Sequence, residues 1–268
     1  RDNGSGSAVY PSHTLRTEYT YNSLNEIIAK SVPDAEDSYY WYDDVGRVVV
    51  AQDGRQRALS PQRYSYTRYD AQGRTIESGE FATSTVLAND GRLNVGDYSI
   101  WLNGEPASAR TSVTRVYYDD LPFVFGELAS AAERNLRTRV AMTSWEATND
   151  DDDTTYDYGT HYEYDATGNV AALVQEIDEL KVISEGYKRI DYEYDYISGN
   201  VHAVYYQKGE PDQYTYRYTY DEDNRLEGVY SSAIATDYLD DLFWERDAGY
   251  EYYEHGPLAR TELGEHRV

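Results

Sequence analysis

A five-residue pattern, Tyr-[Asp/Asn]-x-x-[Gly/Asn], recurs along this chain and restricts what it can fold into. Five unbroken copies begin at Tyr21, Tyr42, Tyr69, Tyr164 and Tyr220. Chance alone would produce about half a copy in a chain of this length and composition. A catalytic motif normally occurs once, whereas a pattern that returns at intervals indicates repeated architecture.

The spacing inside each copy is that of a tight turn. Asp or Asn at the second position can accept hydrogen bonds from backbone N–H groups just ahead. The last position needs a positive φ, which Gly adopts freely and Asn tolerates, so Asn25 and Asn224 can stand for Gly. Each copy therefore predicts a type I turn closed by a G1 bulge, which joins two strands of a β-hairpin. The residues assigned to these turns and to the tyrosines before them are Tyr21, Asn25, Tyr42, Asp43, Gly46, Tyr69, Asp70, Gly73, Tyr164, Asp165, Gly168, Tyr194, Asp195, Gly199, Tyr220, Asp221, Asn224, Tyr252 and Gly256.

The segments on both sides of the turns read as strands. Tyr-x-Tyr precedes most turns, and a period of two places both rings on one face. Apolar segments such as 47–51, 169–174 and 200–205 follow. The chain holds 31 Tyr but only 4 Phe. Tyr offers a flat apolar body with a hydroxyl that reaches water or a partner, which suits a thin sheet better than a dense core.

Incomplete copies extend the series. The copy at Tyr194 has one inserted residue, the copy at Tyr252 lacks Asp, and Tyr118 keeps only the front half. Segment 87–93 has the turn, with Leu87 in place of Tyr. Units of about 20–30 residues that cannot bury a face alone must stack on their neighbours.

The predicted fold is therefore all-β, with hairpins stacked into a continuous, solenoid-like spiralling antiparallel sheet. We expect an N-terminal loop or linker over 1–15 and one array over 16–268, because no Pro/Gly/Ser-rich linker divides the chain. Segment 126–137, rich in Ala, Glu, Leu and Arg, predicts one short helical insertion. The start at Arg1 indicates a fragment or a processed product.

Charge and composition exclude several classes of partner. The chain has 24 basic and 49 acidic residues, a net charge of -25. This balance argues against binding nucleic-acid backbones and against docking on anionic lipid. No Cys is present, so disulfides, thiolate metal sites and cysteine nucleophiles are impossible. No apolar run approaches the roughly 18 residues that a membrane span requires.

The Tyr-Asp-x-x-Gly-Arg units resemble the YD repeats of the RHS (rearrangement hot spot) family, from Tyr19 to about Glu265. Segment 250–264 resembles the RHS portions of large secreted proteins of Bacteroidetes-like bacteria. The resemblance implies a secreted or cell-surface bacterial protein of the polymorphic-toxin type, whose sheet winds into a hollow cocoon. The implied partners are the rest of the shell, an enclosed C-terminal toxin or effector, and delivery or secretion machinery.

Two features of that family are absent from this chain. It lacks the self-cleaving core motif near Asp-Pro-x-Gly-Leu, and it is much shorter than a complete cocoon. The resemblance therefore implies a wall segment without a cleavage site and without cargo.

Candidate chemical groups are better explained by structure than by catalysis. With 49 carboxylates, no acid–base pair can be singled out. The five His residues lack metal-ligand spacing, and no nucleophile elbow or phosphate loop occurs. The acidic run 149–153 suits Ca²⁺ in ligand type but fails the EF-hand pattern, so a solvated loop is favoured. Four scattered Trp residues indicate separate packing sites rather than a sugar-stacking platform; they are Trp41, Trp101, Trp145 and Trp244.

We therefore predict no catalytic, cofactor-binding or metal-binding residue, and a role that is not enzymatic. The favoured function is a structural shell segment that encloses a toxin or effector cargo. The alternative is a cell-surface adhesion module that binds glycan or protein through a Tyr/Trp-rich face. A glycosidase on a β scaffold is a third and weaker interpretation.

Overall fold

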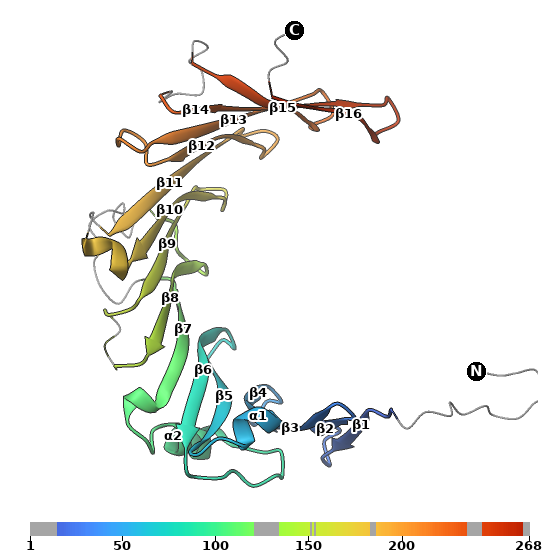
Figure 1. Cartoon of the computed structure of the whole chain (residues 1–268), viewed down its shortest axis with the longest axis vertical. Coiled ribbons are helices and arrows are strands. Elements are labelled where there is room, and N and C mark those ends of the chain that lie inside the picture. Colours follow the sequence, from blue (N-terminus) through green and yellow to red (C-terminus); the bar gives the residue numbers. More distant parts are fainter. Residues whose placement is uncertain are drawn as a thin grey trace, which may run out of the picture. The chain divides into compact units, whose positions relative to one another are not determined.

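The computed structural model describes residues 15–120, 134–150, 152, 154–182, 186–234 and 243–264. Within these ranges, sixteen strands form one antiparallel sheet, in which the strands follow one another in chain order (Figure 1). This confirms the predicted all-β fold of consecutive hairpins. No helix in the described ranges has the length and apolar character needed to cross a membrane.

The chain divides into two compact units, which are described separately. The first comprises Arg1–Arg115 and Glu146–Thr155, and the second comprises Val116–Trp145 and Tyr156–Val268. The single array over 16–268 stays a prediction. The linker predicted over 1–15 lies, except for Leu15, outside the described residues.

The first unit contains six complete strands and most of a seventh. Its strands are β1 (Glu18–Tyr21), β2 (Ile27–Val32), β3 (Ala35–Tyr42), β4 (Val48–Gln52), β5 (Gln62–Tyr69), β6 (Thr75–Thr83) and β7 (Arg110–Tyr118). Its helical segments are α1 (Gly54–Arg57), α2 (Val95–Leu102) and the 3₁₀ turn η1 (Ala107–Ala109).

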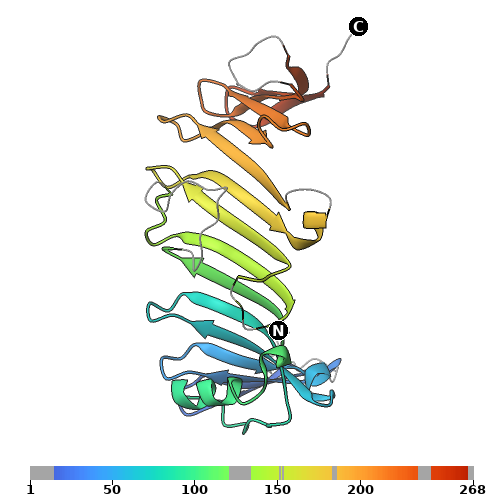
Figure 2. The ribbon, with the colours of Figure 1, turned by 90° about the vertical axis from the view of Figure 1, so that its left-hand side faces the viewer.

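The second unit contains most of one strand and eight complete ones, shown side by side in Figure 2. Its strands are β8 (Val140–Thr148), β9 (Tyr158–Tyr164), β10 (Val170–Ile177), β11 (Tyr187–Tyr194), β12 (Val201–Tyr206), β13 (Tyr214–Tyr220), β14 (Leu226–Ser232), β15 (Glu245–Tyr252) and β16 (Leu258–Leu263). A 3₁₀ turn, η2 (Asp178–Val182), follows β10.

The register of the hairpins contains the bulge that the turn chemistry predicts. In the β3–β4 hairpin Trp41 lies opposite Val50, yet Tyr42 lies opposite Val48, so one residue of the return strand is extra. The same shift occurs beside Tyr69, Tyr220 and Tyr252. A bulge at this place is the G1 type, because it follows a residue with positive φ.

The core of the first unit lies between the sheet and α2. Trp41, Val50 and Phe81 on the strands are at most 1% exposed, and Trp101 of α2 packs against them with 7% exposed. The ring of Trp101 lies edge-on to Phe81, with the ring centres 4.7 Å apart, and edge-on to Tyr64 at 5.2 Å. The helix therefore covers one face of β3–β6.

Helix α2 was not predicted. Its start is capped by Asn94, whose side chain accepts a hydrogen bond from the Asp97 N–H at 3.0 Å. Tyr98, Trp101 and Leu102 are its buried residues, and their spacing of three and four places them on one face.

The sequence also predicted a turn in segment 87–93 and a helix over 126–137, and the structure bears on each of them differently. Segment 87–93 has the expected turn, with φ +74° at Gly91, but it forms no hairpin in the sheet. Instead it lies beside β3, where Arg92 makes an isolated parallel bridge to Tyr42 and Ala88 accepts a hydrogen bond from the Trp41 indole at 2.6 Å. Of the helix predicted over 126–137, residues 126–133 lie outside the described residues, and 134–137 lie in a connection of turns.

Candidate functional site

The Asp or Asn that starts a repeat turn holds the turn with its side chain. The Asp43 carboxylate accepts hydrogen bonds from the N–H of Val45 at 3.0 Å and from the N–H of Arg47 at 2.9 Å. The Arg47 Nε donates to the other carboxylate oxygen at 2.7 Å. Gly46 closes the turn with φ +82°. Asp70 with Arg74 and Asp221 with Arg225 repeat this arrangement.

Two copies keep the geometry with other residue types. Asn169 replaces Arg in the Asp165 turn and donates its amide to the carboxylate at 3.1 Å. In the first copy the chemistry is reversed, because the amide of Asn22 donates to the Glu26 carboxylate at 2.6 Å. Asn25 and Asn224 adopt φ values of +64° and +59° in place of Gly.

In six repeats, the tyrosine before the turn joins that repeat to the preceding one. Its hydroxyl donates to the backbone carbonyl of the first residue of the previous return strand, over 2.8–3.1 Å. We call these residues the anchor tyrosines. Their donor–acceptor pairs are Tyr42–Ile27, Tyr69–Val48, Tyr164–Val140, Tyr194–Val170, Tyr220–Val201 and Tyr252–Leu226.

An arginine makes the second contact between neighbouring repeats. The guanidinium of Arg47 lies over the ring of Tyr69, 4.4 Å from its centre. Arg225 lies over Tyr252 at 4.8 Å in the same way. Tyr69 and Tyr252 thus accept a cation on the ring face while they donate from the hydroxyl, and each contact adds about 0.5–1 kcal/mol.

The long connection that starts at Asp119 preserves these contacts. The Asp119 N–H donates to the carbonyl of Arg139 at 3.0 Å, as Asp43 does to Arg47 at 2.9 Å. Arg139 then lies over the ring of Tyr164, whose hydroxyl reaches Val140. The front half of the repeat at Tyr118 is therefore completed from residues about twenty positions further on.

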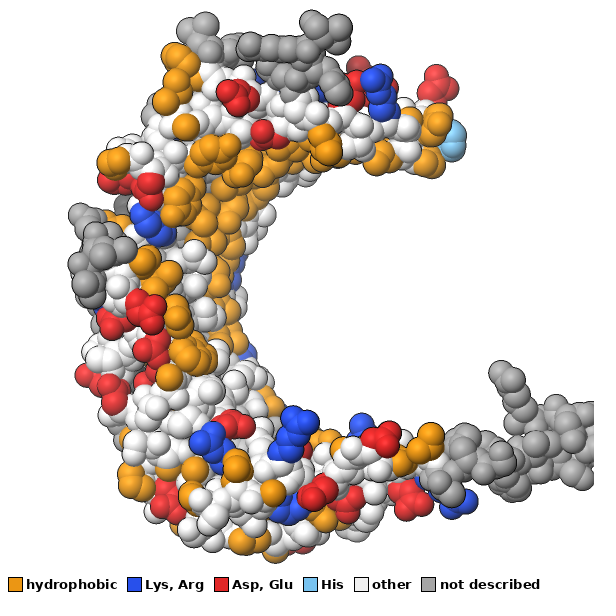
Figure 3. All heavy atoms as spheres, in the orientation of Figure 1, with side chains coloured by type: hydrophobic (Ala, Val, Ile, Leu, Met, Phe, Trp, Pro, Cys, Tyr) orange, Lys and Arg blue, Asp and Glu red, His pale blue; other side chains and the backbone are white. Residues whose placement is uncertain are grey.

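The second unit carries a face of half-exposed tyrosines. Stacked pairs follow the strands, with ring centres 6.4–6.5 Å apart. Hydrophobic side chains gather on this face in Figure 3. Side chains on the opposite face of the sheet, such as His161 on β9 and its neighbour Val174 on β10, are 0% exposed. We define the tyrosine face as Tyr162, Tyr164, Tyr192, Tyr194, Tyr216 and Tyr218.

A buried cluster of charged residues lies in the first unit. Glu77, which is 4% exposed, contacts the guanidinium groups of Arg68, Arg110 and Arg115 at 3.3–3.4 Å. Arg115 also pairs with Glu146, and burial raises the pKa of the Glu146 carboxyl although Arg115 acts against it.

Asn149 belongs to the same cluster. It is 1% exposed and accepts a hydrogen bond from Arg115 at 2.6 Å. The acidic run 149–153 therefore begins with a buried side chain and not with a solvated one. Asp151 and Asp153 lie outside the described residues.

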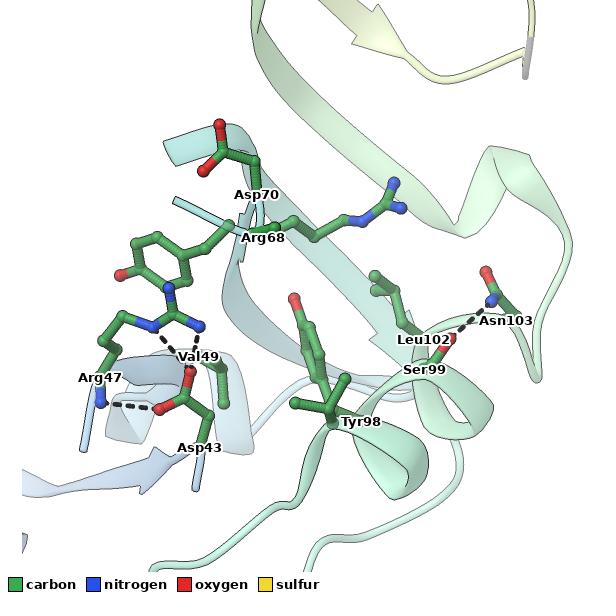
Figure 4. Close-up of a pocket in the computed structure, with 12 residues that line it drawn as sticks. Asp43, Arg47, Val49, Arg68, Asp70, Tyr98, Ser99, Leu102 and Asn103 are labelled. Carbon is green, nitrogen blue, oxygen red and sulfur yellow. Dashed lines mark hydrogen bonds and ion pairs between the residues drawn. The ribbon is translucent and has the colours of Figure 1, made fainter. Parts of the chain in front are cut away.

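A cavity of about 400 Å³ lies in the first unit between the turns at Asp43 and Asp70 and helix α2 (Figure 4). Val49, Tyr98 and Leu102 line its apolar side, and Arg68, Ser99 and Asn103 line a polar side. The sequence does not reveal this cavity, because the cavity depends on α2, which the sequence does not predict.

The remaining candidate groups occupy structural positions. His161 is buried on β9, with its Nε2 3.4 Å from a Glu176 carboxylate oxygen and from the Tyr156 hydroxyl. His202 on β12 lies 3.5 Å from Asp195. Trp41 and Trp101 are core residues. In the described ranges, no group of three or more His, Cys, Asp or Glu side chains is arranged to hold a metal ion.

Replacing Tyr220 by Phe tests the hydroxyl contact between repeats. We expect the second unit to lose about 1 kcal/mol of unfolding free energy, because the partly buried Val201 carbonyl loses a donor while the ring remains. Tyr216→Phe on the same strand is the control, since no hydrogen bond from its hydroxyl occurs within the described residues. Urea unfolding compares them, and equal losses would contradict the role of the hydroxyl.

The Asp165 turn predicts a dependence of stability on acid pH. Desolvation raises the pKa of Asp165, but hydrogen bonds from Thr167, Asn169 and Gly168 outweigh it and hold the pKa at about 2. A folded pKa below the ordinary value of about 3.9 stabilises the fold fully above that pH. The contribution is lost as the pH falls from about 4 towards 2.

Carbon NMR of the Asp165 carboxyl group measures this pKa directly. In Asp165→Asn, which retains an acceptor oxygen as Asn22 does in its own turn, we expect a smaller loss of stability between pH 4 and pH 2. An unchanged acid dependence would show that other carboxyl groups dominate.

Comparisons with known proteins identify the fold. No protein-family model and no curated protein matches the chain. The solved TcdB2-TccC3 structure matches with a TM-score of 0.57 at 14% identity, over 93% of this chain and 10% of the other. The TcdB2-TccC3-Cdc42 structure and TcdB2-TccC3 without its hypervariable C-terminal region each match with a TM-score of 0.56, also at 14% identity and with the same coverage.

A further match is the Photorhabdus luminescens Tc holotoxin pore carrying TccC3-D651A, with a TM-score of 0.36 at 16% identity, over 93% of this chain and 12% of the other. This chain spans about a tenth of the length of the solved chains that it matches. At these identities the likeness shows the fold alone.

Proposed function

We propose that this chain belongs to the RHS/YD-repeat family and is a wall segment of a shell that encloses a toxin or effector polypeptide. The observation that carries the proposal is the contact between repeats, in which each anchor tyrosine donates to the preceding hairpin. The likeness to TcdB2-TccC3 over 93% of the chain supports it.

The proposed role is mechanical and not enzymatic. A sheet whose strands pair in chain order has backbone hydrogen bonds along its length, so a second polypeptide cannot pass between paired strands. The tyrosine face then supplies contact for an enclosed chain. Tyrosine rings pack against varied apolar side chains, and their hydroxyl groups meet polar ones, so one face accepts unrelated sequences.

The proposed partners are the remainder of the shell and an enclosed polypeptide. The likeness to TcdB2-TccC3, a Tc toxin complex, supports a toxin-related assembly and a secreted location for this protein. The net charge of -25 fits a large exposed assembly that must stay soluble.

A site-specific photo-cross-linker tests the enclosure. In one variant the cross-linking residue replaces Tyr218 on the tyrosine face. In the control variant it replaces Tyr196, whose side chain lies at the tip of a turn and is 92% exposed. Each variant is produced in the natural source of the protein, purified together with any bound polypeptide, and irradiated. We expect Tyr218, but not Tyr196, to cross-link to a polypeptide that resists added protease until the protein is denatured.

Failure to cross-link at Tyr218, together with a protease-sensitive partner or none, would overturn the shell. Saturable binding to a glycan array that is lost in Tyr192→Ser and Tyr218→Ser would then favour the adhesion module.

A further inference from the structure

The cavity beneath α2 is not explained by the repeat or by the proposed shell. Most turns in the series supply the same Asp and Tyr groups, but here α2 stands across two neighbouring turns and encloses space between them. Its volume of about 400 Å³ is within the range of small-molecule sites, about 300–1,000 Å³. All of its lining residues belong to the first unit.

The apolar side of the cavity offers surfaces without free polar groups. Val49 and Leu102 present aliphatic carbons, and Tyr98 lies between them in Figure 4. The hydroxyl of Tyr98 donates to the Thr67 carbonyl at 2.9 Å, and that of Tyr69 donates to Val48 at 3.1 Å. Both hydroxyl groups thus donate to backbone carbonyls, and the rings line the cavity with carbon atoms.

The carboxylates at the cavity are already neutralised. Asp43 pairs with Arg47 at 2.7 Å, and Asp70 pairs with Arg74 at 2.6 Å. Each also accepts two backbone N–H groups within its own turn. Because both carboxylates are already paired with an arginine and with backbone N–H groups, they do not favour the binding of a cation in the cavity.

Arg68 is the charge that remains available. Its side chain is 44% exposed, and it shares the single carboxylate of Glu77 with Arg110 and Arg115. Its Nη1 donates to Glu77 at 3.3 Å, and this is its one hydrogen bond among the described residues, so its remaining N–H groups can serve another acceptor. In Figure 4 its guanidinium extends over Leu102, towards the side where Ser99 and Asn103 lie.

We propose that this cavity binds a small organic monocarboxylate with an apolar body. The carboxylate meets the Arg68 guanidinium and the Asn103 side-chain amide, and the body lies against Val49, Leu102 and the Tyr98 ring. A guanidinium–carboxylate contact is charge-assisted and is the stronger kind of hydrogen bond. This site is independent of the shell, because it lies in the first unit and uses no residue of the tyrosine face.

Calorimetry with the full 268-residue chain tests the proposal. Phenylacetate is the ligand, because it combines one aromatic ring with one carboxylate. Phenylacetamide and 2-phenylethylamine have similar bodies with a neutral and a cationic group. We expect saturable binding of one phenylacetate, binding of the amide weaker by about tenfold or more, and no binding of the amine.

Variants of the chain identify the site. Arg68→Gln is expected to weaken phenylacetate binding by about tenfold or more. Arg63→Gln is the matched control, because Arg63 lies on the same strand, is 42% exposed and pairs with Glu80 outside the cavity. Ser99→Trp should abolish binding by filling the space, and circular dichroism checks that each variant is folded.

Three results would overturn the proposal. They are no saturable binding of phenylacetate, equal binding of phenylacetate and phenylacetamide, or equal affinities in Arg68→Gln and Arg63→Gln. None of them bears on the cross-linking experiment at Tyr218.

Discussion

Trp101→Ala is expected to lower the unfolding free energy of the first unit by about 3–5 kcal/mol, the usual range for removing a buried aromatic side chain. Trp101 is the largest side chain through which α2 contacts the sheet, with its ring centre 4.7 Å from Phe81 and 5.2 Å from Tyr64. Without it, the helix loses its main apolar contact and the rings beneath it meet water.

Ile100→Ala is the matched control for this variant. Ile100 is adjacent on the same helix but 74% exposed, so its loss should change stability by no more than about 0.5 kcal/mol. Urea unfolding gives the free energies, and amide hydrogen exchange shows whether protection falls over α2 and β3–β6. Equal effects of the two substitutions would show that α2 does not stabilise the sheet.

Arg115→Met is the second substitution with a large expected effect, about 3–5 kcal/mol lost from the first unit. Arg115 is 6% exposed and contacts Glu77, Glu146 and Asn149. Its removal leaves Glu146 buried without the cation that lowers its pKa, so the carboxyl group must take up a proton or remain charged at high cost.

Arg63→Met supplies the control for Arg115→Met. Arg63 pairs with Glu80 at 2.9 Å, but both side chains are more than a third exposed, so we expect a loss of at most about 1 kcal/mol. Adding Glu146→Gln to Arg115→Met should recover part of the loss, because the unpaired charge disappears. A loss no larger than that of Arg63→Met would contradict the role of the cluster.

The sequence predicted the parts of the fold that local chemistry determines. The turn at Asp43 depends on five consecutive residues, because the Asp43 side chain and the Gly46 conformation act within the turn itself. The alternation of Tyr192 and Tyr194 likewise follows from the period of a strand. Such features need no knowledge of which strand pairs with which.

The contacts between repeats could not be predicted in the same way. The sequence indicates that tyrosine hydroxyl groups need partners, but Tyr42 and Ile27 are joined only through the register of two hairpins. Helix α2 carries the capping residues Asn94 and Asp97, yet its eight residues include a glycine and β-branched residues, which favour helix poorly. Its stability comes from packing of Trp101, which sequence patterns do not show.

The buried cluster of charged residues is the largest feature that the sequence does not predict. Glu77, Arg115 and Glu146 resemble ordinary solvated residues on alternating strands, and Asn149 begins an acidic run. Only the three-dimensional structure shows that they share one buried site, because the partners are separated by more than thirty residues.

The contact between repeats also has a direction. In the six contacts described above, a hairpin offers a carbonyl to the hairpin after it and receives one tyrosine hydroxyl from that hairpin. In three of them it also offers an arginine. Tandem duplication or deletion of a whole repeat in the gene would therefore join the same donor to the same acceptor. An insertion of half a repeat would leave either a tyrosine hydroxyl without its carbonyl acceptor or a carbonyl without its hydroxyl donor. Genes for such sheets can consequently lengthen or shorten in whole repeats without any compensating mutation at the new boundary.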